Sequence, residues 1–272
     1  MPDYRIKSVH AVQVQSRRHN MAVSARVETM DGAVGKALCY AGVSVGTHEV
    51  HFQYDGGNRW GGLGCMSAVR NVNTIIADTI LGMDVRNQFE IDQAMLSIQG
   101  NGSASVGGNA IAAVSAAVLK AGAAATQMPL YRYIGGENAC MLPVPGAPAF
   151  SGGERWGGAV HTHGNKPTGA FQCFGYDSFS EASSAAWDMY HLFAKELEKR
   201  GVTEGDWFFY RIPAGIFKHS DEELFELMAD VIHKTGNDGK ATVDQSLCKY
   251  GSIFLYLFSI FLKFRLQDFT ES

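Results

Sequence analysis

The chain has 272 residues, of which 46% are hydrophobic and 18% charged, and its formal net charge is −4. This apolar content excludes a disordered chain, and the absence of a basic block argues against a nucleic-acid-binding surface. Five scattered cysteines form no CxxC pair, and the opening residues lack the apolar segment of a secretory signal. We therefore expect a reduced, cytoplasmic protein with no nucleic-acid partner and no disulfide framework.

The first forty residues predict an antiparallel β-hairpin or meander. Valine-rich apolar residues recur at short spacing over residues 6–14 and 21–38, and a polar stretch at 16–20 separates the two runs. Within the second run, Asp31 and Gly32 form a dipeptide that is typical of a tight hairpin turn.

Beyond residue 40 the pattern changes from strands to loops and helices. Two glycine-rich stretches, residues 41–46 and 55–64, are predicted to be loops. Apolar residues then recur at spacings of three and four over 66–76 and over 89–98, as amphipathic helices require. Residues 109–125 are dominated by alanine and carry an apolar stripe, which predicts a helix that can pack closely.

The second half predicts strands that alternate with helices. Residues 140–153 contain three of the seven prolines, which is typical of a crossing between domains. Residues 180–200 and 221–234 are predicted to be helical, and residues 241–243 form a short predicted strand that ends at Asp244. This alternation indicates βα units and a parallel sheet.

A run near the end of the sequence, IFLYLFSIFL at 253–262, contains no charge. A membrane-spanning helix needs about 20 apolar residues, roughly twice the length of this run. A buried strand or helix is therefore favoured over a membrane anchor, and we expect no membrane partner.

Several stretches, taken in order, resemble the enolase family. The opening hairpin is followed by AGVSVGTHE at 41–49, which is similar to the family's mobile substrate loop. Five further matches follow: NVNTIIADTILGMD at 71–84, IDQAML at 91–96, GGNAIAAVSAAVLKAGAAA at 107–125, PLYRYIGG at 129–136 and LPVP at 142–145. Together the matches cover residues 6–145.

The resemblance implies an α/β protein in three parts. Residues 1–138 would form an α+β capping domain, a three-stranded meander plus helices. Residues 139–250 would begin a partial β/α (TIM-type) barrel, and residues 251–272 would be a divergent apolar tail.

The resemblance also implies an activity. Enolases are lyases of glycolysis that dehydrate 2-phosphoglycerate to phosphoenolpyruvate with magnesium, a lysine base and an acidic group near the departing hydroxyl. It implies a phosphorylated small-molecule substrate, and either a homodimer or a partnership with a full-length enolase.

Within the substrate loop, Gly42, Ser44 and Gly46 match the family. The serine that is expected to bind the second magnesium ion falls instead on Ala41, whose side chain offers no oxygen. The family pattern is therefore kept in the glycines of the loop and lost in its metal ligand.

After the LPVP stretch, the substrate-binding histidine of the family falls on Arg155. His161 and His163 lie nearby and could compensate or bind a metal, but exposed histidines without a function are favoured because no third ligand is in view.

The acidic groups of the family's site are also replaced. The segment FQCF places Cys173 at one acidic position, and a buried, inert cysteine is favoured there over a nucleophile. The second acid falls on Arg211 without a gap, or on Trp207 with one. Arg155 and Arg211 could form a new anion site, although ion pairs with other side chains are favoured.

Asp244 matches a metal-binding aspartate of the family and is the one metal ligand that we predict. A single carboxylate is a poor Mg²⁺ site, and a helix-capping or surface role is equally open. The resemblance ends near Tyr250, so the remaining metal carboxylates and the lysine base have no counterparts.

Three interpretations follow from these residues. The chain is an enolase-like protein that is catalytically impaired, a non-catalytic relative that acts as an interaction or dimerisation partner, or a truncated gene product.

Overall fold

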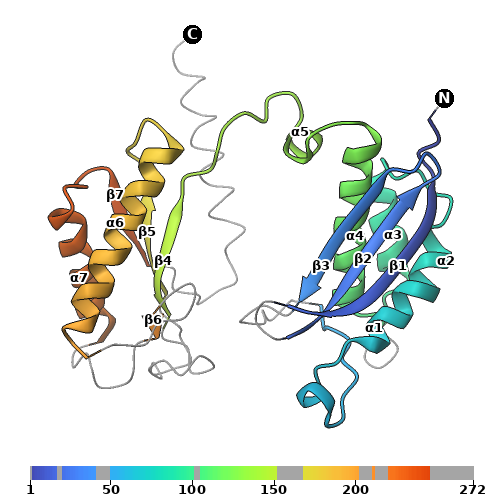
Figure 1. Cartoon of the computed structure of the whole chain (residues 1–272), viewed down its shortest axis with the longest axis horizontal. Helices are drawn as coiled ribbons and strands as arrows, with labels where there is room; N and C mark the ends of the chain where they lie inside the picture. Colours follow the sequence, from blue (N-terminus) through green and yellow to red (C-terminus); the bar gives the residue numbers. More distant parts are fainter. Residues whose placement is uncertain are drawn as a thin grey trace. The chain divides into compact units, whose positions relative to one another are not determined.

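A computed structural model of the chain describes residues 2–16, 20–40, 50–100, 105–151, 168–201, 210–211 and 220–245. For residues 150–151, 168, 210–211, 220–222 and 244–245 it describes the backbone alone. The chain divides into two compact units, Met1–Cys140 and Met141–Ser272, which are described separately below (Figure 1).

The first unit contains a three-stranded antiparallel meander, as the sequence predicts. Its strands β1 (Ile6–Gln15), β2 (Met21–Thr29) and β3 (Val34–Tyr40) lie in the order β1-β2-β3. The predicted turn joins β2 to β3, where Gly32 adopts a φ of 89° and donates its N–H to the Thr29 carbonyl at 3.0 Å. Glycine suits this position because a left-handed backbone costs it little.

The helices of this unit follow the predicted ranges closely. The predicted helix over 66–76 is confirmed and continues further, as α1 (Met66–Asn71), a π-helical turn η2 (Val72–Ile76) and α2 (Ala77–Ile80). The other two predictions correspond to α3 (Gln88–Ser97) and α4 (Gly108–Ala125). Two short helices were not predicted: η1 (Arg59–Gly62), within a predicted loop, and α5 (Leu130–Gly135).

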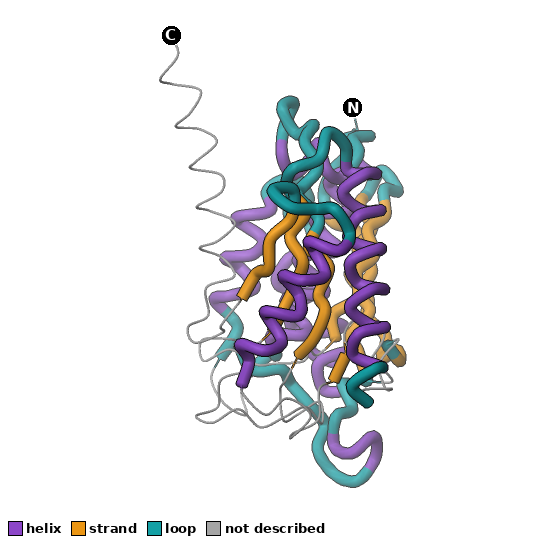
Figure 2. Tube along the Cα trace, turned by 90° about the vertical axis from the view of Figure 1, so that its left-hand side faces the viewer, coloured by secondary structure: helices purple, strands orange, loops and turns teal. Residues whose placement is uncertain are grey.

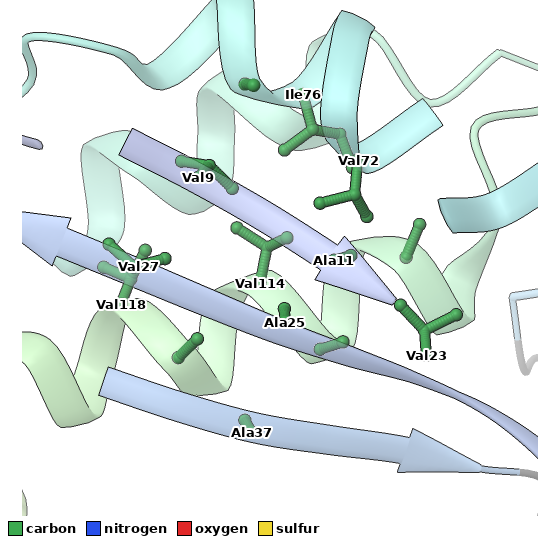
Figure 3. Packing of buried hydrophobic residues seen from close by; sticks show 14 of the residues in the cluster. Val9, Ala11, Val23, Ala25, Val27, Ala37, Val72, Ile76, Val114 and Val118 are labelled. Atoms are coloured by element: carbon green, nitrogen blue, oxygen red, sulfur yellow. The ribbon is translucent and has the colours of Figure 1, made fainter. Parts of the chain in front are cut away.

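The core of the first unit lies between one face of the sheet and the helices (Figure 3). Alternate residues of the central strand, Val23, Ala25 and Val27, are fully buried and face Val114 and Val118 of α4. Each fully buried valine contributes about 1.5–3 kcal/mol of hydrophobic stabilisation.

Close packing of α4 on β3 depends on a glycine. A Cβ atom added to Gly35 would lie 1.9 Å from the Ala117 carbonyl oxygen, so no other residue fits without moving the helix. The prediction that small residues allow this helix to pack closely is therefore confirmed. Among the described residues, α4 alone has the length and apolar composition of a membrane-crossing helix, and half of it is buried inside the unit as a core helix.

The second unit contains a four-stranded sheet covered by two long helices. Its strands β4 (Gly146–Ser151), β5 (Thr168–Cys173), β6 (Tyr210–Arg211) and β7 (Ala241–Gln245) lie in the order β6-β4-β5-β7. The helices α6 (Phe179–Glu198) and α7 (Ser220–Lys234) match the two predicted ranges and pack on one side of the strands (Figures 1 and 2).

The predicted parallel sheet is only partly correct: three of the described strands, β4, β6 and β7, run in the same direction, and β5 is reversed. Among the described strands, β4 and β6 are parallel, whereas β5 runs antiparallel to both β4 and β7. The segment between β5 and β7 contains α6, the short strand β6 and α7, so the two strands that pair here are distant in the sequence. The partial barrel remains a prediction, and the tail at residues 251–272 lies outside the described residues.

The core of the second unit is formed by aromatic and aliphatic side chains between this sheet and its helices. Phe171 of β5 and Phe193 of α6 are fully buried, with ring centroids 5.9 Å apart in an edge-to-face arrangement. Ser178 caps the start of α6 by accepting a hydrogen bond from the Glu181 N–H at 3.2 Å. None of these core residues belongs to the core of the first unit.

Candidate functional site

Three of the predicted site segments lie outside the described residues. They are the substrate loop, with Ala41, Gly42, Ser44 and Gly46, the segment that contains Arg155, His161 and His163, and the segment that contains Trp207. The structure does describe the chain that leads into the loop, which is β3, and the chain that follows it from Val50 onward.

The segment that follows the loop is anchored to the first turn of α4. Gly108 donates its N–H to the His51 carbonyl at 2.9 Å. The fully buried Asn109 accepts the Gln53 N–H at 3.0 Å and donates to the Gln53 carbonyl at 3.1 Å. A Cβ atom at Gly107 would lie 2.6 Å from the Gln53 Cβ, so this glycine allows the close approach.

The same segment is also anchored to the start of α1, through Asp55. The Asp55 carboxylate accepts the backbone N–H groups of Met66 at 2.9 Å and Ser67 at 2.7 Å. Desolvation raises the pKa of Asp55, but the hydrogen bonds from Ser67 and Met66 outweigh it and hold that pKa below its usual value. Asp55 thus acts as a helix cap, a structural role that the sequence analysis did not assign.

Cys173 lies in the core rather than on an open surface. It is the last residue of β5, it is 2% exposed, and it packs with Ala182 and Ala241 between the sheet and the helices. Burial raises the pKa of its thiol, which disfavours the reactive thiolate. All four cysteines of the described ranges, Cys39, Cys65, Cys140 and Cys173, are free thiols.

The sheet separates Cys173 from the other predicted positions. Cys173 pairs with Ala241, whereas Asp244 pairs with Ala170, three residue pairs and about 10 Å further along the sheet. Because successive residues of a strand alternate between faces, an offset of three places these two positions on opposite faces.

Arg211 and Asp244 lie toward the same end of the sheet but on its two outer strands. Arg211 is in β6 and pairs with Ser151, while Asp244 is in β7. The intervening strands β4 and β5 separate them by about 14 Å, at roughly 4.8 Å per strand. The sheet therefore does not bring the predicted positions Cys173, Arg211 and Asp244 into a single cluster.

The described residues do not supply the metal site that the resemblance implies. In the ranges with described side chains, no three His, Cys, Asp or Glu residues lie close enough together to hold a metal ion. The side chain of Asp244 lies outside those ranges.

The second unit does contain a pocket that the sequence analysis did not predict. Its volume is about 380 Å³, and it lies beyond the end of β5, between the first turns of α6 and the turn before β7. Tyr176 donates its hydroxyl hydrogen to the Asn237 Oδ1 at 2.6 Å, and the Lys240 Nζ lies 5.6 Å from the centroid of the Tyr176 ring. The lining residues are Gly175, Tyr176, Asp177, Glu181, Ser184, Ala185, Asp188, Thr235, Asn237 and Lys240.

This pocket lies at the Cys173 end of the sheet, away from Arg211 and Asp244. Its carboxylates belong to exposed residues, and they do not converge into a metal-binding group. Its walls come from segments about 60 positions apart in the sequence, so no local motif could have revealed it.

The geometry of the first unit defines a class: an α+β domain in which a three-stranded meander packs against helices that follow it in the chain. Residues 6–134 of this unit match the family model of the enolase N-terminal domain. The chain is 40% identical to an enolase of Campylobacter jejuni over 199 residues, which are 72% of this chain and 47% of the relative.

Two archaeal relatives agree with this result. The chain is 40% identical to an enolase of Methanosarcina acetivorans over 202 residues, 73% of this chain and 46% of the relative. It is 41% identical to an enolase of Methanopyrus kandleri over 198 residues, 72% of this chain and 45% of the relative. The chain belongs to the enolase family, and it spans about half the length of the curated relatives that it matches.

Proposed function

We propose that the chain is an enolase-type lyase by descent and that, alone, it is catalytically impaired. The reaction to be tested is the family's magnesium-dependent dehydration of 2-phosphoglycerate to phosphoenolpyruvate in glycolysis. The observation that carries this proposal is the match of residues 6–134 to the enolase N-terminal domain, together with the meander and the helices that the structure shows there.

Two observations support the family reaction. The family's loop residues Gly42, Ser44 and Gly46 are present in the sequence. In addition, the chain after that loop is held on α4 by the buried side chain of Asn109. The chain is therefore held in place directly after the loop segment.

The proposed impairment rests on the chemistry of the substituted positions. Ala41 cannot supply a side-chain oxygen to a metal, and the Arg155 and Arg211 side chains are cations where the family has a histidine and an acid. Cys173 packs between the sheet and the helices, where its thiol is buried. Loss of one positioned catalytic group costs about 10²-fold or more in rate, so this set predicts a severe loss.

The test is an assay of the purified chain for magnesium-dependent formation of phosphoenolpyruvate from 2-phosphoglycerate. Circular dichroism confirms folding, and a full-length enolase of Campylobacter jejuni assayed in parallel serves as the reference. We expect kcat/KM to lie at least 10²-fold below the reference. A folded chain within tenfold of the reference would contradict the proposed impairment.

A second candidate function, binding to another enolase chain, is favoured by the outer face of the first sheet. Val12, Leu38 and Tyr40 are each about half exposed there, at 47%, 45% and 46%. Val12 and Leu38 flank Ser24 in the register, so these apolar side chains gather on one face. We propose that this face takes part in a homodimer or in a complex with a full-length enolase.

Sedimentation of the chain alone, and of a mixture with a full-length enolase, tests this second candidate. We expect a complex that is weakened when Leu38→Lys places a charge on the face. Thr79→Lys is the control, because it adds the same charge on α2, away from this face of the sheet. Equal sedimentation of the wild type and both variants as monomers would exclude the binding function.

A further inference from the structure

The first strand of the chain lies at the edge of its sheet. β1 pairs with β2 on one side only, so the backbone groups on its other side have no partner strand within this sheet. Edge strands are commonly protected by proline or by several charged residues. β1 contains no proline, and Lys7 is its only lysine or arginine, so its sequence offers little of this protection.

The structure shows how this edge is covered instead. At the start of β1, Ile6 donates its N–H to the Met83 carbonyl at 2.8 Å and accepts the Gly82 N–H at 2.9 Å. In the middle of β1, the side chain of Asn73 binds Ala11. Its Oδ1 accepts the Ala11 N–H at 2.6 Å, and its Nδ2 donates to the Ala11 carbonyl at 3.0 Å.

The Asn73 amide therefore makes the same pair of hydrogen bonds that a residue of a neighbouring antiparallel strand would make. A side-chain amide has one carbonyl and one N–H₂ group, which together reproduce the acceptor and donor of a peptide unit. The amide satisfies both outward-facing backbone groups of Ala11 and occupies the position of an added strand.

The helix holds Asn73 in this position. Asn73 lies in the π-helical turn η2, and the residues Val72 and Ile76 on either side of it are fully buried in the core. Their burial fixes the turn against the sheet, where η2 contacts β1. Asn73 itself is half-buried, with its amide directed at the strand edge.

We propose that Asn73 occupies the hydrogen-bonding groups at the edge of β1 and thereby prevents β1 from pairing with β1 of a second copy of this chain. Antiparallel pairing centred on Ala11 would be two-fold symmetric, so two identical edges could satisfy each other. Valine-rich β1 has the composition of a stable strand. Removal of the amide would leave the Ala11 groups without a partner, which favours displacement of the η2 turn from the edge by a second β1 strand. This inference is independent of the proposed enolase chemistry.

The test compares two asparagines of the same helical segment. Asn73→Leu keeps the size of the side chain and removes both hydrogen bonds to Ala11. Asn71→Leu is the matched control, because Asn71 is also half-buried and donates its Nδ2 to a backbone carbonyl, that of Val106 at 2.9 Å, and not to a group of β1. Sedimentation velocity over a hundredfold range of concentration, with circular dichroism, is measured for the wild type and both variants.

We expect Asn73→Leu to self-associate at concentrations at least tenfold below those at which the wild type or Asn71→Leu does so. Hydrogen exchange at the Ala11 amide should become faster in dilute Asn73→Leu and be protected again in the associated form. A folded Asn73→Leu variant that sediments like Asn71→Leu at every concentration, with fast Ala11 exchange throughout, would overturn the proposal. If the leucine variant does not fold, Asn73→Ala is measured against Asn71→Ala with the same criteria.

Discussion

The two units of this chain stabilise their sheets in different ways. In the first, a continuous meander of three long strands packs on the buried face of a helix, α4. In the second, strands from distant parts of the chain form a mixed sheet whose outer strand β6 has two residues. The sheet of the first unit thus pairs strands that are neighbours in sequence, whereas the sheet of the second includes pairings between distant segments.

The two cores also differ in the size of their side chains. The core of the first unit consists mostly of alanine and valine, with a glycine at the closest approach of strand and helix. The second is built around fewer, larger side chains such as Phe171 and Phe193. A small-residue core tolerates no added atom, whereas a core built on a few aromatics loses most when one of them is removed.

The largest effect is expected from Phe171→Ala. Removal of a fully buried phenylalanine costs about 3–5 kcal/mol, because hydrophobic burial is lost and a cavity remains. Since its contacts lie within the second core, we expect the transition of the second unit to move and that of the first to stay. Urea unfolding, monitored by hydrogen exchange of amides in each unit, measures the two transitions separately.

Phe174→Ala is the matched control for that experiment. Phe174 is 51% exposed and should have only a small effect. Equal destabilisation of both units by Phe171→Ala would show that they unfold as one, against the separation of their cores.

Gly35→Ala should have the next largest effect, this time in the first unit. The added methyl group would meet the Ala117 carbonyl at 1.9 Å, so α4 must move away from β3 at a cost of about 3 kcal/mol. Gly32→Ala provides the comparison. At Gly32 the space is open and the φ is 89°, so we expect a cost of about 1 kcal/mol from the backbone alone. If the two variants had the same melting temperature, the close approach of α4 and β3 would be contradicted.

The sequence predicts the first unit better than the second for a physical reason. The meander and α4 arise from short-range periodicity and from the Asp31-Gly32 turn, all of which can be read within a few residues. The direction of β5 relative to β7 depends on pairing across about 70 residues, which no local pattern encodes. The two-residue strand β6 has no detectable signal of its own.

The same distinction holds for individual side chains. The bond between Asn73 and Ala11 spans 62 positions, and that between Asn109 and Gln53 spans 56. Neither could be inferred from spacing. The resemblance identified Cys173 by its place in a motif, but the face of the sheet on which it lies depends on the register of β5 with β7.

Asp55→Ala should destabilise the first unit by about 1 kcal/mol at neutral pH, because two N–H groups at the start of α1 lose their acceptor. The lowered pKa of Asp55 fixes the pH dependence of this difference. The carboxylate contributes its full stabilisation above its unfolded pKa of about 3.9, and the contribution disappears as the pH falls through the lower folded value.

Thermal melts of wild type and Asp55→Ala between pH 7 and pH 2.5 measure this effect. The difference between them should be constant down to about pH 5 and should shrink below pH 4. Met66→Ala replaces a half-exposed side chain, keeps the backbone N–H that binds Asp55 and serves as the control. A difference that grew on acidification would mean that Asp55 is not a charged cap.

The smallest effect is expected from the corresponding cap in the second unit. Ser178→Ala removes one exposed hydrogen bond to the Glu181 N–H and should cost about 0.5 kcal/mol, in the second unit only. Ser178→Gly should cost only a few tenths of a kcal/mol, because glycine at an N-cap leaves the terminal N–H groups open to water. Hydrogen exchange of the first turn of α6 resolves effects of this size. An alanine variant that altered exchange in the first unit would contradict the independence of the two units, since α6 makes all its core contacts within the second.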